Sequence, residues 1–115
     1  MFSTIDGIFM SENYKLSFYV PETHLDTVKA AVFASGAGRQ GDYEHCCWQT
    51  RGQGQFRPSK EARPFIGLAD ELSQVAEYKV ELLCEAGRIA NAIAALKAAH
   101  PYEEPAYDVI SLLDI

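Results

Sequence analysis

Apolar and polar residues alternate along two stretches of the chain, 14–20 and 78–84. A period of two is typical of a β-strand with one buried face. The residues expected on the buried faces are Leu16, Phe18, Val20, Tyr78, Val80, Leu82 and Cys84. The residues expected on the opposite face are Tyr19, Lys79, Glu81 and Leu83, which form a mixed surface.

Two further stretches, 22–35 and 87–99, place apolar residues at helical spacing. In the first, Glu22 and Asp26 lie near the start, where the helix dipole favours acidic side chains. Gly36 is expected to end this helix, with Gly38 following. The predicted buried stripe of the second helix consists of Ile89, Ile93 and Leu96.

The other predicted elements are a strand over 41–50, a turn followed by a short strand through Phe56, a loop over 57–68 with Pro58 and Pro64, and a last strand over about 106–113. Residues 68–76 fit either a helical turn or an irregular link. The order β-α-β-β-α-β predicts an α+β, ferredoxin-like sandwich with an extended middle hairpin. Residues 1–13 are interpreted as an N-terminal extension to a domain at 14–115, and Met10 is an alternative start to Met1.

The formal net charge of −6 and the pI near 4.9 disfavour non-specific binding to nucleic acid or anionic membranes. No apolar run approaches the roughly 20 residues of a membrane span, and the N-terminus has no secretory-signal pattern. Three cysteines, Cys46, Cys47 and Cys84, are a low and odd number. Free thiols in a cytoplasmic compartment are expected.

The stretch "HPYEEPAYDV", 100–109, concentrates polar and rigid residues between the last helix and the last strand. His100 continues the helical stripe and sits at a helix C-terminus, which favours an imidazolium. One interpretation is a capping histidine in a structural corner. The other is a divalent-metal site of His100 with Glu104 or Glu103, because imidazole and carboxylate suit zinc and similar ions. Further ligands would have to come from elsewhere.

The stretch "WQTRGQGQFRP", 48–58, is the second candidate site. Glycine permits tight turns and close backbone approach, and the polar side chains suit a polar or anionic ligand. The predicted ligand-binding residues are Trp48, Gln49, Gly52, Gly54, Gln55, Arg57 and, from the other stretch, Tyr102. A purely structural hairpin tip is the alternative. No catalytic residue is predicted, because no triad pattern accompanies the cysteines.

These two stretches, with "RPFIG" at 63–67 and "YKVELLC" at 78–84, resemble the PII/CutA-like domain of the YqfO, or Nif-three-like, family over about 14–115. In full-length members this domain is inserted between the halves of a dinuclear-metal protein that is often described as GTP-cyclohydrolase-like. The 115 residues contain neither half, and three histidines cannot rebuild that metal site. The resemblance therefore implies a standalone PII/CutA-like domain.

PII and CutA relatives are small oligomers that bind effectors or metal ions at subunit boundaries. The resemblance thus implies a homo-oligomeric regulatory protein that senses a divalent metal or a small ligand. The corner at 100–108 is expected to present His100 and Glu104 beside the 48–58 hairpin, either within one subunit or across a subunit interface. A protein-interaction adaptor is the alternative function, and a GTP-cyclohydrolase-like enzyme is the less favoured one.

Overall fold

The computed structural model describes residues 3–5 and 8–114 of the 115-residue chain, with side chains over 13–113. The strands are β1 (Ser3–Ile5), β2 (Ile8–Pro21), β3 (Trp48–Phe56), β4 (Ser73–Glu85) and β5 (Tyr107–Asp114). The helices are α1 (Leu25–Ala34) and α2 (Ile89–Ala99), preceded by the 3-10 turns η1 (Glu22–His24) and η2 (Ala86–Arg88).

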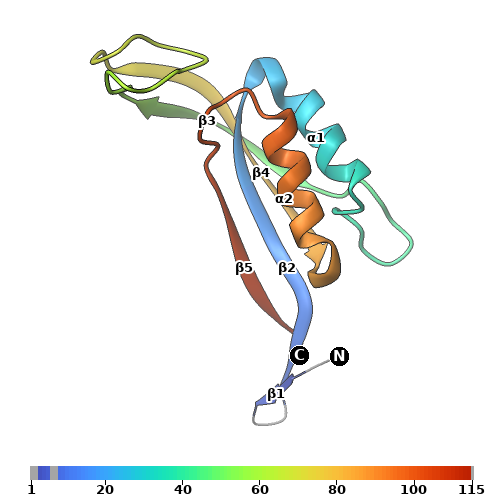
Figure 1. Ribbon diagram of the computed structural model, residues 1–115. Coiled ribbons are helices and arrows are strands. Elements are labelled where there is room, and N and C mark those ends of the chain that lie inside the picture. Colours follow the sequence, from blue (N-terminus) through green and yellow to red (C-terminus); the bar gives the residue numbers. More distant parts are fainter. Residues whose placement is uncertain (1–2, 6–7, 115) are drawn as a thin grey trace.

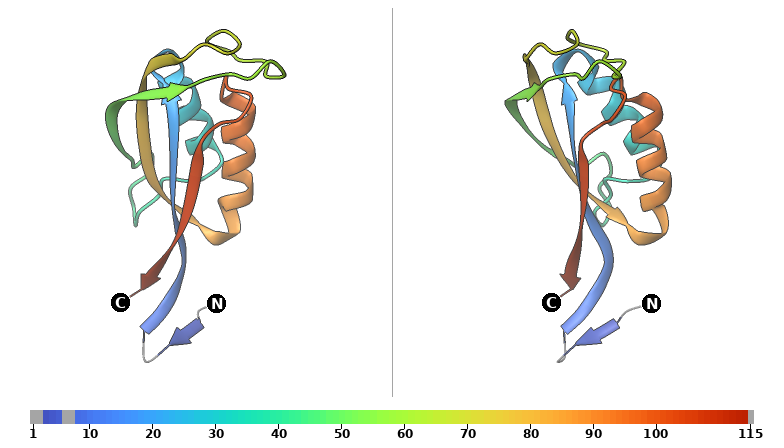
Figure 2. Two further views of the ribbon diagram at one scale, coloured as in Figure 1. Left: turned by 90° about the vertical axis from the view of Figure 1, so that its left-hand side faces the viewer. Right: turned by 60° about the vertical axis from the view of Figure 1, so that its left-hand side comes forward.

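All described strand pairs are antiparallel, and β2 lies at the centre of the sheet (Figure 1). β4 and β5 pair with β2, β3 pairs with β4, and β1 pairs with the start of β2. Both helices cover one face of the sheet, while the other face carries no helix (Figure 2). The predicted α+β, ferredoxin-like fold is confirmed.

The core lies between this sheet and the two helices. It consists of Leu16, Phe18, Val20, Val28, Val32, Ala37, Val80, Leu82, Cys84, Ala92 and Leu96. The predicted inward faces of both alternating strands are confirmed, although Tyr78 is only half-buried. In α2 the expected Leu96 is buried, but Ile89 and Ile93 are half-buried and Ala92 is fully buried instead. The inward face is therefore offset from the predicted stripe.

Helix α1 ends as its glycines predict. Gly36 has φ +96°, a left-handed conformation that glycine adopts at little cost, and its N–H donates to the Phe33 carbonyl at 2.9 Å. Gly38 has φ +81° and lies so close to the Phe33 ring that a Cβ would meet it at 2.8 Å. A side chain at position 38 would therefore collide with the helix.

The predictions for the middle of the chain were partly wrong. Residues 41–47 form a loop, in which the exposed His45 stacks on Phe33 at 5.0 Å between ring centroids. Gly52 and Gly54 lie inside β3 instead of at a turn, and the connection to β4 runs over 57–72. β3 is an edge strand with both sides largely exposed, so its sequence carries no apolar alternation.

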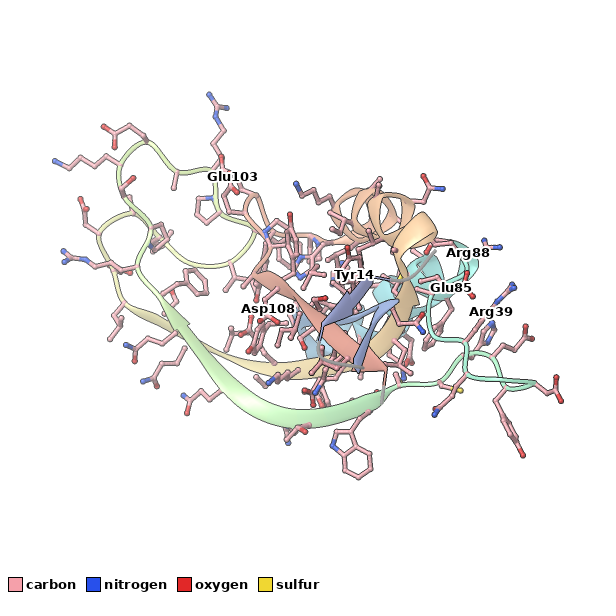
Figure 3. All side chains as sticks on the ribbon, turned by 90° about the horizontal axis from the view of Figure 1, so that it is seen from below. Tyr14, Arg39, Glu85, Arg88, Glu103 and Asp108 are labelled. Atoms are coloured by element: carbon pink, nitrogen blue, oxygen red, sulfur yellow. The ribbon has the colours of Figure 1, made fainter. Side chains whose placement is uncertain are left out.

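Two strand boundaries also differ from the prediction. β2 begins at Ile8, inside the stretch interpreted as an N-terminal extension, and β4 begins at Ser73. Residues 1, 2, 6 and 7 of that extension, including the proposed start Met1, lie outside the described residues. β5 keeps its predicted position, and Asp108 is exposed on it, on the side of the sheet away from the helices (Figure 3).

The uncovered face of the sheet mixes charged and apolar side chains. Glu81 forms ion pairs with Lys15 at 2.8 Å and Lys79 at 3.6 Å. The hydrogen bond from Lys15, together with both positive charges, holds the pKa of Glu81 below its usual value although burial opposes this. Trp48 and Ile110 are 71% and 53% exposed beside these pairs. No helix in the described part of the chain is long and apolar enough to cross a bilayer.

Candidate functional site

The 57–72 loop folds back on itself where it leaves and rejoins the sheet. The Asp70 N–H donates to the Pro58 carbonyl at 2.7 Å, and Arg57 Nε donates to the Asp70 carbonyl at 3.0 Å. Asp70 has φ +60°, and Pro58 is buried under the closure. The first turn of the loop is therefore fixed to its last turn.

His100 fixes the opposite wall, the corner between α2 and β5. His100 is 6% exposed, and both of its ring nitrogens bond to backbone. Nε2 lies 2.7 Å from the Tyr19 carbonyl, and Nδ1 accepts the Tyr102 N–H at 3.1 Å. A carbonyl requires a donor and an N–H requires an acceptor, so the pair of bonds selects the neutral tautomer with the proton on Nε2.

The charge state of His100 corrects the expectation of an imidazolium. Burial lowers its pKa from the usual value, an effect that outweighs the bond to the Tyr19 carbonyl and the negative charge of Glu77. The nearby His24 lowers it further. The helix C-terminus is therefore a weaker influence on this histidine than the loss of water around it.

Tyr102 connects the corner to strand β4. Its hydroxyl donates to Glu77 Oε2 at 2.8 Å, and burial and the Glu77 carboxylate both raise the pKa of Tyr102. The other oxygen, Glu77 Oε1, occupies the space that a Cβ on Gly54 would need. Glycine at position 54 thus lets the Glu77 carboxylate lie against β3 and face Tyr102.

Three contacts hold the loop and the end of β3 against their neighbours. The Arg63 N–H donates to Glu103 Oε1 at 3.1 Å, and the rings of Phe56 and Tyr102 are 6.2 Å apart. Phe65 meets the His24 ring edge-on at 5.2 Å. From the sequence, the stretches 48–58 and 100–108 could meet within one subunit or across an interface. In the structure they meet within one chain, through Phe56 and Tyr102.

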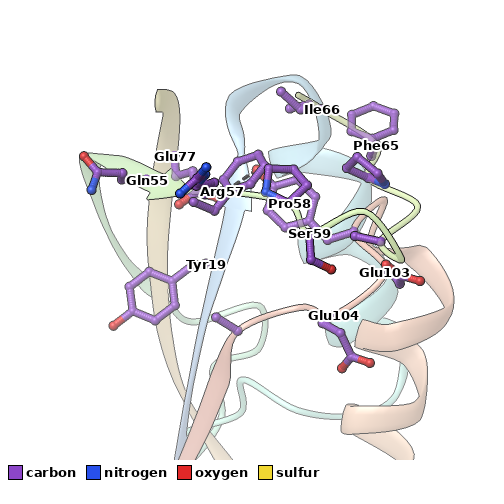
Figure 4. Close-up of a pocket in the computed structure, with 16 residues that line it drawn as sticks. Tyr19, Gln55, Arg57, Pro58, Ser59, Phe65, Ile66, Glu77, Glu103 and Glu104 are labelled. Carbon is purple, nitrogen blue, oxygen red and sulfur yellow. Dashed lines mark hydrogen bonds between the residues drawn. The ribbon is translucent and has the colours of Figure 1, made fainter. Parts of the chain in front are cut away.

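Between the loop, the sheet and the corner lies a cleft of about 640 Å³. Its aromatic lining is Tyr19, Phe56, Phe65 and Tyr102, and its charged lining is Arg57, Glu77, Glu103 and Glu104. Figure 4 shows Tyr19 and Glu77 on one side of this space and Glu103 and Glu104 on the other. Apolar walls with a few polar groups are the usual make-up of a small-molecule site.

The cleft brings together five of the predicted site residues, namely Gly54, Gln55, Arg57, Tyr102 and Glu104. The other four lie outside it. Trp48 lines a smaller hollow of about 460 Å³ on the uncovered sheet face, and Gln49 accepts a bond from Lys29 Nζ at 2.8 Å. Gly52 faces open space, and His100 lies behind the wall, bonded to backbone.

A divalent metal does not fit His100 and Glu104 as they are arranged. Both nitrogens of His100 are engaged by backbone groups, so coordination would break a buried hydrogen bond. Among the described residues no group of three or more His, Cys, Asp or Glu side chains could hold an ion. The geometry favours the structural interpretation of the corner.

Sequence reasoning missed Tyr19, Phe65 and Glu77 as parts of this site. The alternation predicts only that Tyr19 lies on the uncovered face, and Phe65 falls in a predicted irregular loop. Glu77 lies just past residues 68–76, which fit either a helical turn or an irregular link, and in the structure it pairs with Gly52 in the β3–β4 register. A glycine two residues farther along β3, at 54, was the available signal that a neighbouring side chain needed space.

No family model matches the chain. It is 46% identical over 99 residues to the GTP cyclohydrolase 1 type 2 homolog of Mycobacterium leprae, covering 86% of this chain and 26% of that protein. It also superposes on a Bacillus cereus protein related to NIF3 with a TM-score of 0.74 and 36% identity, over 87% of this chain and 25% of that one. The chain thus spans about a quarter of these relatives, and the match supports the predicted Nif-three-like relationship over that segment.

Two smaller proteins match along most of their own length. CutA from Xylella fastidiosa has a TM-score of 0.64 and 16% identity, covering 89% of this chain and 85% of that one. The GlnK–ATP complex of B. subtilis has a TM-score of 0.59 and 10% identity, covering 90% and 84%. At these identities the likeness concerns the fold alone, which is the PII/CutA-like form of the ferredoxin-like sandwich.

Proposed function

We propose that this chain is a PII/CutA-like regulatory module that binds a small organic ligand in the cleft between the 57–72 loop and the 100–106 corner. The observation that carries the proposal is the cleft itself. It joins residues from both predicted site stretches, and its volume of about 640 Å³ lies within the range of about 300–1,000 Å³ usual for ligand pockets.

Rigidity of the walls supports the same function. The loop is closed by the Asp70–Pro58 bond, and the corner is fixed by the two bonds of His100. A site whose walls are already ordered loses less conformational entropy when a ligand binds. The ordering also gives a ligand a way to act, because one bound in the cleft touches both the loop and the corner that follows α2.

A thermal-shift screen of charged and neutral small molecules tests the proposal. Ala62 lines the cleft, so Ala62→Trp should fill it, whereas Lys60→Trp changes an exposed position of the same loop outside the cleft. Ligands that stabilise the natural protein and the Lys60→Trp variant should fail to stabilise Ala62→Trp. If every ligand found stabilises all three proteins equally, the cleft is not the binding site.

We further propose that the module is a homo-oligomer assembled through the uncovered sheet face. Trp48 and Ile110 are more than half exposed there, and Leu83 and Leu112 line the adjoining hollow. Exposed apolar side chains gathered on one face favour association with another surface. A second copy of the chain is the occupant that a symmetric oligomer requires.

One observation favours the alternative function, an adaptor for a protein partner. The 57–72 loop exposes Phe65, Leu68 and Leu72 by 51%, 65% and 61%. Because Phe65 also lines the cleft, binding of a partner to the loop would depend on whether the cleft holds a ligand. Leu68→Ser with Leu72→Ser should abolish partner capture in the adaptor case and leave ligand-induced stabilisation unchanged in the ligand-binding case.

A further inference from the structure

We infer that the ligand of the cleft is an organic cation, a protonated amine or guanidinium carried on an apolar or aromatic body. This inference rests on the proposed function and specifies its ligand class. It reverses the sequence-based interpretation, in which glutamines and Arg57 suggested a polar or anionic ligand. Three features of the cleft carry it: its carboxylates, the position of Arg57 and its aromatic walls.

The carboxylates come from both sides of the cleft. Glu77 projects from β4; its Oε2 accepts the Tyr102 hydroxyl and its Oε1 lies against Gly54 of β3, so its negative charge is held at the cleft wall. Glu103 uses one oxygen to hold the Arg63 N–H. Glu104 is exposed and makes no hydrogen bond or ion pair with any residue the structure describes. A cation between these groups would meet carboxylates from two walls.

Arg57 does not neutralise this arrangement. Of the described residues that line the cleft, it is the one with a positive charge, against three carboxylates. Its Nε is committed to the Asp70 carbonyl, and this bond closes the loop. The chain as a whole carries a formal charge of −6, so the long-range field also attracts cations and repels anions.

The aromatic walls favour the same class of ligand. Tyr19, Phe56, Phe65 and Tyr102 supply rings whose faces carry partial negative charge. An ammonium or guanidinium group within about 6 Å of such a face is attracted, and the attraction grows as water is excluded. The apolar body of the ligand would meanwhile cover ring surface. A neutral molecule gains binding free energy only from covering ring surface, and an anion is repelled by the carboxylates.

Calorimetric titration with three indoles of similar shape tests the inference: tryptamine, which is a cation, tryptophol, which is neutral, and indole-3-acetate, which is an anion. Tryptamine should bind about tenfold more tightly than tryptophol, and indole-3-acetate more weakly than both. Raising the salt concentration should weaken only tryptamine binding toward the tryptophol level. Ala62→Trp should abolish binding of tryptamine.

Matched variants identify the carboxylate. Glu104→Gln should weaken tryptamine about threefold and leave tryptophol unchanged. Glu61→Gln, on the 57–72 loop but outside the cleft, should leave both unchanged. Equal or tighter binding of indole-3-acetate in the cleft would overturn the inference while upholding the proposed function. Failure of tryptamine to bind would also overturn it, and the library screen with Ala62→Trp would then decide the proposed function separately.

Discussion

His100 has a different role from that of a metal ligand, although its sequence neighbourhood fits both. Its two ring nitrogens satisfy one buried carbonyl on β2 and one N–H just past α2. Backbone groups buried without a partner cost about 1–3 kcal/mol each. The histidine therefore satisfies backbone groups of the corner that no strand or helix pairs, and its neighbours Tyr102 and Glu104 line the cleft instead.

Replacing His100 by alanine should lower the free energy of unfolding by about 3 kcal/mol, because two buried backbone groups lose their partners and a cavity remains. His24→Ala is the control, since His24 is half-buried and, within the described part of the chain, hydrogen-bonds only the exposed Thr23 hydroxyl and stacks in a T-shaped contact with Phe65. It should cost less than about 1 kcal/mol. Urea denaturation measures the free energy of unfolding of both variants. Similar losses would contradict the role of His100 in pairing the Tyr19 carbonyl and the Tyr102 N–H.

Stability should also depend on pH through His100. The pKa of the folded-state imidazole lies below its usual 6.5, so the unfolded chain takes up the proton first as pH falls. The contribution of the neutral ring is complete above 6.5 and is lost between 6.5 and the lower folded-state value.

The measurement is the free energy of unfolding from pH 8 to pH 5 for the natural protein and for His100→Gln, which cannot titrate. Carboxylates contribute equally to both curves, so their difference isolates the histidine. The natural protein should lose more stability than the variant in the acidic part of this range. Parallel curves would show that His100 is not the titrating group.

At the scale of elements, β3 shows how one missing side chain shapes the cleft. Gly52 and Gly54 share the strand and its register with β4, but their surroundings differ. A Cβ at Gly52 would meet nothing within 4 Å, whereas a Cβ at Gly54 would displace the Glu77 carboxylate. The close approach of Glu77 therefore depends on the second glycine alone.

Gly52→Ala should raise the free energy of unfolding by about 0.5 kcal/mol, because alanine loses less backbone entropy in a strand. Gly54→Ala should lack this gain, since the moved carboxylate breaks the Tyr102–Glu77 bond at a cost of about 1 kcal/mol. Thermal or urea unfolding compares the two. If both alanines stabilise equally, the Glu77 carboxylate is not held at Gly54.

Alternation and helical spacing predicted the elements that have one buried face. The strands through Phe18 and Val80 and the helix that ends before His100 follow from the sequence for this reason. Edge strand β3 has almost no buried side, so its glycines resembled a turn. The cleft could not be predicted, because it depends on contacts such as Arg63–Glu103 that join residues 40 positions apart.

At the scale of the whole molecule, the sheet has one face packed by helices and one face uncovered (Figure 2). The ion pairs of Glu81 lie on the uncovered face next to exposed Trp48. Such a face can be solvated where it is charged, but its apolar part is best covered by another chain.

Trp48→Glu should therefore shift the protein to a lower mass in size-exclusion chromatography with light scattering, without loss of circular dichroism signal. The fold should tolerate the change because Trp48 is 71% exposed. Leu68→Glu is the control, since Leu68 is 65% exposed but lies on the 57–72 loop. A natural protein that is already monomeric at micromolar concentration would contradict assembly through this face.

Nuclear magnetic resonance can test whether the cleft between the loop and the corner is the proposed ligand site, because it reports residue by residue where a ligand binds. Isotope-labelled protein would be titrated with tryptamine and with zinc in separate experiments. Tryptamine should shift the amide signals of 54–66 and 102–106, and zinc should leave the signals of His100 unchanged. Zinc shifts centred on His100 and Glu104, without a tryptamine response in the cleft, would contradict this location of the site.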